Sequence, residues 1–210
     1  QVVRPVTALV VVDVQNDFIT GSLNLSNCPA GHDGAEVISP VNKLVEEIDF
    51  DAVVYSLDWH PTNHISFIDN IHLREIHPSC SVTHETASLF DVVTFQLEDR
   101  KQDQKMWPRH CVQDTWGAEL HKDLKIHETA VFVKKGTVPD TDSYSVFWDN
   151  NKMTHTSLND DENGYRTILL EDACRGVSEE DIAITKANIS ANHGIIVNSS
   201  QVSDLLNDYL

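Results

Sequence analysis

The sequence predicts an α/β fold: a doubly wound parallel sheet flanked by helices, lacking one β-α unit. Short, continuous apolar runs recur along the chain and are typical of central parallel strands, which are buried on both faces. An amphipathic helix separates the first two runs, and a β-α-β order implies a right-handed crossover in a parallel sheet. The 210 residues contain no repeat, linker or low-complexity tract, so we expect one domain, 1–210.

The expected elements follow from local patterns. Apolar residues at Val37, Val41, Leu44, Val45 and Ile48 recur at helical spacing and predict a helix over 37–48. A second helix is expected over 178–190, with Ser178 as its cap and acidic residues in its first turn. A short helix is expected over 120–124. The expected strands are 7–14, 51–57, 130–134, 166–171 and 194–197.

Two long stretches do not fit a regular α/β alternation. Residues 61–107 show no sustained period and are rich in His, Ser, Thr and Asp, which predicts a long functional or mobile loop. Residues 136–165 are polar or aromatic and contain no buried strand or long apolar-faced helix. A doubly wound sheet would normally have a β-α unit there, which is why one unit is predicted to be missing.

Composition limits the partners and the compartment. A formal net charge of −18 disfavours binding to nucleic acids and to anionic membranes. No apolar run is long enough to span a bilayer. Four cysteines with no metal-ribbon or redox spacing favour a reducing compartment, so a cytoplasmic location is expected. The first residue is Gln1, so we expect a trimmed start. The sequence leaves a homo-oligomer possible.

Charged residues stand at or just beyond the ends of three expected strands. These residues are Asp13, Asp58 with His60, and Lys135. In open parallel sheets, ligands bind at the edge formed by the carboxyl ends of the strands. One aspartate at a strand end is explained by capping or turn formation. Three charged sites on one edge, one of them next to Gly136, favour a functional site.

Asp58 and His60 offer a carboxylate and an imidazole that can reach one metal ion, because positions two apart in a strand point the same way. His64 follows shortly after, and His110 lies at the far end of the long loop. The chain has eleven histidines, so a surface role is the better interpretation for any single one. The Asp-x-His pair shifts the balance modestly toward metal binding.

Six motifs stand in order along nearly the whole chain. They are VVDVQNDF (11–18), DWHPTNHISF (58–67), WPRHCV (107–112), KG (135–136), DSYSVF (142–147) and GYRTILLEDACRGV (164–177). Together they resemble the motifs of the nicotinamidase family, within the isochorismatase-like cysteine hydrolases. The metal motif argues against plain isochorismatases, which lack that metal.

The resemblance implies a role for each matching residue. Asp13 would be the general base, and Lys135 would support it and a nucleophilic thiol electrostatically. The metal would be zinc, with iron or manganese as alternatives, and would bind the pyridine nitrogen of nicotinamide. Its ligands would be Asp58, His60 and His110, with His64 as a fourth ligand or a supporting residue. Flat aromatic walls suit a pyridine ring, and the family pattern assigns them to Phe18, Trp107 and Tyr144.

The sequence departs from the family at the nucleophile. The family carries its cysteine in a strand-loop-helix segment between the lysine strand and Gly164, but here residues 158–163 run directly into Gly164. The amides of the oxyanion hole belong to the same segment. A shortened inactive form and an omission from the sequence both explain this. A substitute role for Cys174 is a third explanation, although packing explains Cys174 better, and Cys111 is also expected to be structural.

Two classes of function therefore stay open. The first is an amidohydrolase that converts nicotinamide to nicotinate and ammonia in NAD salvage. The second is a catalytically inactive protein that binds the metal and nicotinamide. Continuity of the backbone between Asp160 and Asn163 would help to discriminate them.

Overall fold

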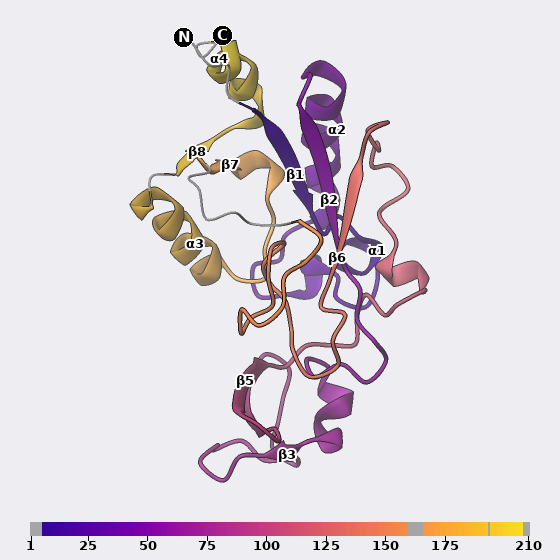
Figure 1. Cartoon of the computed structure of the whole chain (residues 1–210), viewed down its shortest axis with the longest axis vertical. Coiled ribbons are helices and arrows are strands. Elements are labelled where there is room, and N and C mark those ends of the chain that lie inside the picture. Colours follow the sequence, from indigo (N-terminus) through magenta and orange to yellow (C-terminus); the bar gives the residue numbers. More distant parts are fainter. Residues whose placement is uncertain (1–5, 159–165, 193, 208–210) are drawn as a thin grey trace.

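The computed structural model describes residues 6–158, 166–192 and 194–207. Its central element is a parallel sheet in the order β1-β2-β6 (Figure 1). The strands are β1 (Ala8–Val12), β2 (Ala52–Asp58) and β6 (Val131–Lys135). Their ranges match the expected strands within one or two residues.

Helix α2 (Ile38–Glu47) connects β1 to β2 and covers one face of this sheet. Its buried residues Ile38, Val41 and Leu44 pack with β1 and β2 in the main hydrophobic core. The predicted helix and the predicted β-α-β crossover are therefore confirmed. Because strand side chains alternate between faces, the residues that pack on α2 are every second one along β1 and β2.

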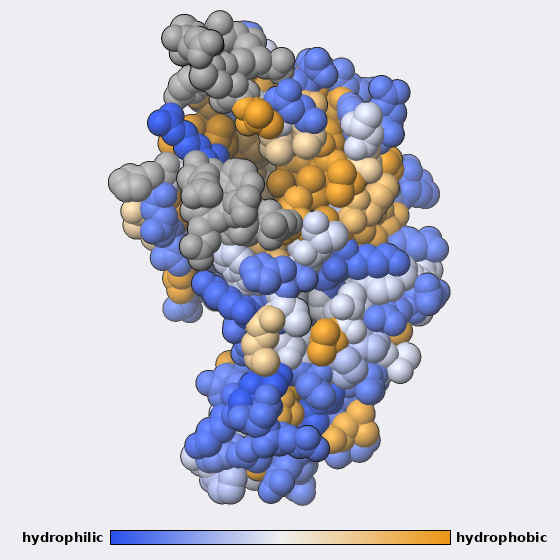
Figure 2. Space-filling view, in the orientation of Figure 1, coloured by the Kyte–Doolittle hydropathy of each residue, from blue (hydrophilic) through white to orange (hydrophobic). Residues whose placement is uncertain are grey.

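The opposite face of the sheet is more open. Val10 and Val12 of β1 and Val131 of β6 share that face and are 38 %, 50 % and 46 % exposed. Figure 2 shows the resulting apolar surface over the region of these strands. An α/β sheet flanked by helices on both sides would cover such residues.

The stretch 61–107 is not the irregular loop that its lack of period predicts. It contains the 3₁₀ helix η3 (Ile68–Leu73) and an antiparallel sheet of β3 (Glu75–Ile76), β4 (Val92–Gln96) and β5 (Lys101–Lys105). A second core of buried apolar residues supports it, namely Ile65, Ile71, Val93, Phe95 and Met106. The apolar pattern did not predict this sheet because β5 is entirely polar, although its Gln102 and Gln104 are buried.

The C-terminal part forms a separate pair of parallel strands, β7 (Ile168–Leu170) and β8 (Ile195–Val197). Helix α3 (Glu179–Ala191) connects them, and the Ser178 hydroxyl caps it as predicted by accepting from Asp181 N. Within the described ranges, β7 and β8 make no ladder with β1, β2 or β6, so the single sheet expected from the sequence is split in two. This is consistent with an absent β-α unit between them. The junction between Asp160 and Asn163 lies outside the described residues.

The remaining elements are short. The helix expected over 120–124 is wrong: Leu120 forms an isolated bridge with Gln15, and Leu124 N closes a turn on His121 O. Where the structure is described, none of the helices is long and apolar enough to cross a membrane. The short elements are α1 (Asn16–Ile19), α4 (Val202–Asn207), and the 3₁₀ helices η1 (Leu25–Asn27), η2 (Gly34–Val37), η4 (Trp116–Ala118), η5 (Glu171–Ala173) and η6 (Ser199–Gln201).

Candidate active site and metal centre

The three strands of the central sheet deliver charged residues to one edge. Asp58 and Lys135 end β2 and β6 and are register partners, and Asp13 follows β1 directly. Lys135 Nζ lies 2.7 Å from Asp13 Oδ2, which confirms the predicted proximity of these two side chains. Asp13 has φ 55°, a left-handed conformation that is uncommon outside glycine and is found at functional sites.

Lys135 is the buried cation of this edge. Its ammonium also pairs with Asp58 Oδ1 and donates to Ser143 O at 3.2 Å. Burial alone would lower the pKa of Lys135, but the carboxylates of Asp13 and Asp58 outweigh it and raise that pKa well above its ordinary value. Lys135 therefore stays protonated.

The two carboxylates next to Lys135 differ in their pKa. Burial, opposed by Lys135 and reinforced by the charge of Asp58, raises the pKa of Asp13 above its ordinary value. Burial also acts on Asp58, but Lys135, His60 and His110 overcome it and hold the pKa of Asp58 far below its ordinary range. Two adjacent carboxylates with divergent affinities for a proton suit different roles, one as base and one as ligand.

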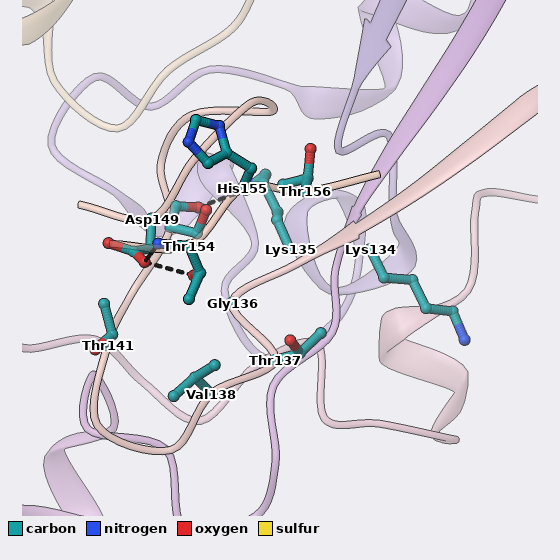
Figure 3. Close-up of a pocket in the computed structure, with 11 residues that line it drawn as sticks. Lys134, Lys135, Gly136, Thr137, Val138, Thr141, Asp149, Thr154, His155 and Thr156 are labelled. Atoms are coloured by element: carbon teal, nitrogen blue, oxygen red, sulfur yellow. Dashed lines mark hydrogen bonds between the residues drawn. The ribbon is translucent and has the colours of Figure 1, made fainter. Parts of the chain in front are cut away.

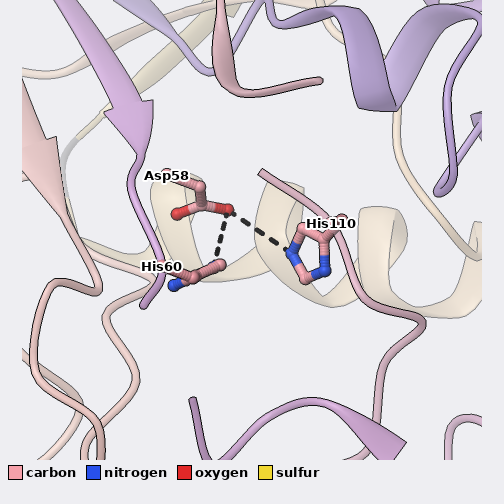
Figure 4. A group of neighbouring side chains, drawn as sticks. All are labelled: Asp58, His60 and His110. Atoms are coloured by element: carbon pink, nitrogen blue, oxygen red, sulfur yellow. Dashed lines mark ion pairs between the residues drawn. The ribbon is translucent and has the colours of Figure 1, made fainter. Parts of the chain in front are cut away.

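The residues predicted as metal ligands come together (Figure 4). Asp58, His60 and His110 are all buried, and their donor atoms lie within 4.8 Å of one another. Asp58 Oδ2 is 3.6 Å from His60 Nε2 and 3.8 Å from His110 Nε2. Two imidazoles and a carboxylate are a donor set that zinc binds.

Each histidine is oriented by a hydrogen bond at its other nitrogen. His60 Nδ1 donates to Gly136 O at 2.8 Å, and His110 Nδ1 donates to Pro108 O at 2.7 Å. These bonds leave both Nε2 atoms free to face Asp58, which is the usual arrangement for metal-binding histidines. The side chains that are present therefore fit a divalent metal.

Gly136 is required for this approach of the backbone to His60. Its φ is +62°, and a Cβ there would lie 2.3 Å from His60 Cε1. A residue with a side chain would have to displace the imidazole, so the glycine follows from the geometry of the metal centre.

Two further buried residues lie beside the predicted ligands. His64 stacks on His60 with ring centroids 4.1 Å apart, and its buried Nε2 has no hydrogen-bond partner among the described residues. Burial, reinforced by the charge of His60, lowers the pKa of His64 to about 3, so its imidazole stays neutral. Asp142, His60 and His64 form a second group whose donor atoms lie within 4.8 Å of one another. The sequence reasoning missed Asp142, although it begins the family motif at 142–147.

The three aromatic residues predicted to wall the pocket lie near the centre or near each other. Phe18 packs on His110 with ring centroids 5.6 Å apart. Trp107 Nε1 donates to Tyr144 Oη at 3.1 Å, which links the other two walls. Tyr144 is 56 % exposed, but desolvation of its hydroxyl and the charge of Asp142 raise its pKa, so the hydroxyl keeps its proton.

A small polar pocket lies around Lys135 (Figure 3). Five of its lining residues bear hydroxyl groups, namely Thr137, Thr141, Ser143, Thr154 and Thr156, and Asp149 also lines it. Lys134, the residue before Lys135, is another lining residue, and its ammonium lies 3.6 Å from the ring centroid of Trp59. Lys135 is buried and pairs with Asp13 and Asp58 whereas Lys134 is exposed, so alternation along β6 selects Lys135 for the site.

The four cysteines are all free, and two of them bear on the nucleophile. Cys111 is fully buried, its Sγ faces Gly117 O at 3.8 Å, and burial with nearby carboxylates raises its pKa far above the ordinary value. Cys174 is exposed, so the packing role expected for it is wrong. Partial desolvation raises its pKa, and its charged neighbours are Arg175, Asp172 and Lys186 rather than the Asp13–Lys135 pair. Both thiols are therefore held protonated, which is unfavourable for a nucleophile.

Comparisons with known proteins agree with this geometry. The Isochorismatase domain matches residues 7–151. A nicotinamidase of Acinetobacter baylyi is 34 % identical over 200 residues, covering 94 % of this chain and 82 % of that protein. The solved Acinetobacter baumanii nicotinamidase/pyrazinamidase superposes with a TM-score of 0.74 at 30 % identity, covering 95 % of this chain and all of the other.

A pyrazinamidase of Pyrococcus horikoshii solved in complex with zinc has a TM-score of 0.62 and 26 % identity, covering 92 % of this chain and 99 % of the other. The resemblance seen in the motifs is therefore confirmed in both sequence and structure. The chain belongs to the isochorismatase family, among its nicotinamidase-like hydrolases that act on an amide.

Proposed function

We propose that this chain binds nicotinamide at a divalent-metal centre, in a site built to hydrolyse it to nicotinate and ammonia. One observation carries the proposal. The Lys135 ammonium bridges Asp13 and Asp58, and the other oxygen of Asp58 faces His60 and His110. A base, a cation and a metal-binding set thus share one buried edge, and these groups can together promote hydrolysis of an amide.

Asp58, His60 and His110 would hold the metal, and zinc is the proposed ion. When bound, the ion would supply a Lewis acid that fixes and polarises the pyridine ring through its nitrogen. The zinc-bound pyrazinamidase relative supports this choice. The neutral and unpartnered His64 Nε2, with Asp142 beside it, makes His64 the candidate for a further ligand.

Side chains of the protein would provide proton transfer, electrostatic stabilisation and enclosure of the substrate ring. Asp13, whose pKa is raised, would accept a proton from the nucleophile, and Lys135 would hold Asp13 in place and stabilise a thiolate. Phe18, Trp107 and Tyr144 would enclose the flat ring and exclude water.

Turnover also needs a thiolate beside Asp13 and oxyanion donors near the reacting oxygen. The family segment that supplies them is absent from the sequence between Lys135 and Gly164. The raised pKa values of Cys111 and Cys174 do not favour either thiol as a replacement. We therefore propose that the literal chain binds nicotinamide and metal but releases no ammonia above background.

Calorimetry with nicotinamide and the zinc-loaded chain tests binding, and an ammonia assay tests turnover. We expect binding that needs zinc, and no ammonia. Absence of binding to the zinc-loaded chain would overturn the proposed ligand. Turnover abolished by Cys174→Ala would show that Cys174 replaces the family nucleophile and that the inactive form is wrong.

A further inference from the structure

We infer that Gln15 and Asp17, which flank Asn16 where the chain leaves β1 and enters α1, position the ligands of the metal centre. Gln15 holds the backbone of Asp58, and Asp17 holds the loop that carries His110. The two ligands come from distant parts of the sequence, so something must set their separation. This inference rests on the proposed function, because it takes Asp58 and His110 as metal ligands.

Gln15, which holds the backbone of Asp58, is fully buried. Its Oε1 accepts from Asp58 N at 2.8 Å, and its Nε2 donates to Asp58 O, also at 2.8 Å. Strand β1 ends at Val12, and the main chain turns away at Asp13. The Gln15 amide therefore continues the β1–β2 ladder by one more residue and pins both polar groups of the Asp58 backbone.

The same amide reaches a third segment. Gln15 Nε2 also donates to Ala118 O at 2.8 Å. Ala118 ends η4, which follows the His110 loop, so a single side chain bonds the strand that carries one ligand and the segment that follows the other. All of these groups are buried, where an unmade hydrogen bond is costly.

Asp17, which holds the loop that carries His110, has a buried carboxylate that accepts hydrogen bonds from backbone amides. Its Oδ2 accepts from Cys111 N at 2.7 Å, and its Oδ1 accepts from Ser22 N at 2.9 Å. Cys111 directly follows His110 and has φ 46°, so its backbone is in the left-handed region that side chains disfavour. The bond to Asp17 compensates for that conformation and fixes where His110 projects.

Two glycines close around the Asp17 carboxylate. A Cβ on Gly21 would lie 2.2 Å from Asp17 Oδ1, and a Cβ on Gly117 would lie 2.0 Å from Asp17 Oδ2. The carboxylate thus occupies a fitted socket with no room to shift. The socket supports a positioning role because it restricts the carboxylate beyond what its two hydrogen bonds require.

Residues that support metal ligands in this way typically change metal affinity by about 10–100-fold when they are lost. We expect Gln15→Met and Asp17→Asn to weaken zinc binding by about tenfold or more. Competition with a chromophoric chelator measures the affinity, and thermal unfolding of the zinc-free protein measures stability separately.

Asn16→Ala is the matched control. Asn16 lies between Gln15 and Asp17 in the sequence and is buried. Its Nδ2 donates to Trp116 O at 2.8 Å and not to the backbone of Asp58 or Cys111. We expect Asn16→Ala to lower the melting temperature of the zinc-free protein but to leave zinc affinity within about twofold, because each ligand keeps its support. A purely structural role for the segment would weaken zinc binding equally in all three variants.

A second pair of variants tests the socket without removing any hydrogen-bonding group. Gly21→Ala and Gly117→Ala should displace Asp17 and weaken zinc binding as Asp17→Asn does. Gly176→Ala is their control, because its Cβ would meet only the flexible side chain of Ile182, at 2.9 Å. This pair keeps the inference testable if Gln15→Met or Asp17→Asn does not fold.

The outcomes separate the inference from the proposed function. If the wild-type chain binds no zinc, the proposed metal centre fails. If the wild type binds zinc and the variants at residues 15, 17, 21 and 117 bind it within twofold as well, the metal centre stands and the positioning role is overturned. Equal weakening by Asn16→Ala would also overturn it.

Discussion

Lys135 Nζ lies 2.7 Å from Asp13 Oδ2, and the same ammonium pairs with Asp58, which faces His60 and His110, the proposed metal-binding histidines. One buried cation thus couples the proposed base to the proposed metal centre. A change in the charge at Asp58, by metal binding or by substitution, will shift the pKa of Asp13, because both carboxylates pair with Lys135. The pKa values of the two carboxylates move in opposite directions although Lys135 lowers both. Burial and the charge of Asp58 prevail at Asp13, whereas His60 and His110 add to the effect of Lys135 at Asp58.

Lys135→Met should destabilise the metal-free protein strongly. It leaves Asp13 and Asp58 buried without their cation, and removing one partner of a buried ion pair costs about 3–5 kcal/mol. Urea unfolding gives the free energy of unfolding. Lys134→Met is the control: Lys134 is exposed and its ammonium lies over the Trp59 ring, so its loss should cost about 1 kcal/mol or less. Equal losses would contradict the role assigned to Lys135.

The metal centre should lose its ion when any of its ligands is removed. After chelator treatment and reloading, we expect one zinc per wild-type chain and a marked loss in Asp58→Asn, His60→Ala and His110→Ala. Metal analysis by mass spectrometry checks this, and a crystal structure should show zinc–nitrogen distances of about 2.0–2.1 Å. His84→Ala, at an exposed histidine bonded only to Arg74 O, should keep its zinc. A metal-free wild type would refute the site.

Gly136→Ala should weaken zinc binding because the added Cβ displaces His60. Gly31→Ala makes a matched comparison: Gly31 has φ +63°, nearly the same as Gly136, but nothing lies within 4 Å of its Cβ. Both variants carry the backbone cost of a left-handed residue, about 1 kcal/mol. Only Gly136→Ala should lower zinc affinity in a chelator competition. A similar loss in both variants would mean that backbone strain, and not contact with His60, is responsible.

Trp107→Ala should weaken nicotinamide binding by about tenfold, or about 1.4 kcal/mol, if its ring walls the pocket. Tyr144→Phe removes the acceptor of the Trp107 Nε1 bond while keeping its ring, so the loss should be smaller. Calorimetry on the zinc-loaded protein provides both affinities. Trp116→Ala, at a tryptophan that is 57 % exposed, should leave binding unchanged. Unchanged binding in Trp107→Ala would remove this residue from the pocket.

Asp149 should contribute stability that depends on pH. Burial opposes its charge, but bonds from Thr154 and from the amides of Asn151 and Met153 prevail and lower its pKa. A carboxylate with a lowered folded-state pKa adds stability above its unfolded value of about 3.9, and this is lost as pH falls through the folded pKa. The difference in melting temperature between wild type and Asp149→Asn should therefore shrink from pH 6 to pH 3. A constant difference would show that its charge is not involved.

Apolar patterns along the chain determined much of the fold. The strands β1, β2 and β6 and helix α2 follow from continuous or helically spaced apolar residues, because burying those residues is the main driving force for folding. Helix α3 follows instead from its Ser178 cap and the acidic residues of its first turn. The order of the strands in the sequence is enough to place Asp13, Asp58 and Lys135 at one sheet edge. The motif resemblance added the aromatic residues and His110, which no local pattern indicates.

Only the tertiary structure decided how buried polar groups pair. Strand β5 escaped prediction because its buried residues are glutamines, and Asp142 because its neighbours come from the His60–His64 segment. Gln15 was only a polar residue after a strand until its bonds to Asp58 and Ala118 were seen. Apolar burial is non-directional and leaves a periodic trace in sequence, whereas a hydrogen bond depends on where distant segments meet.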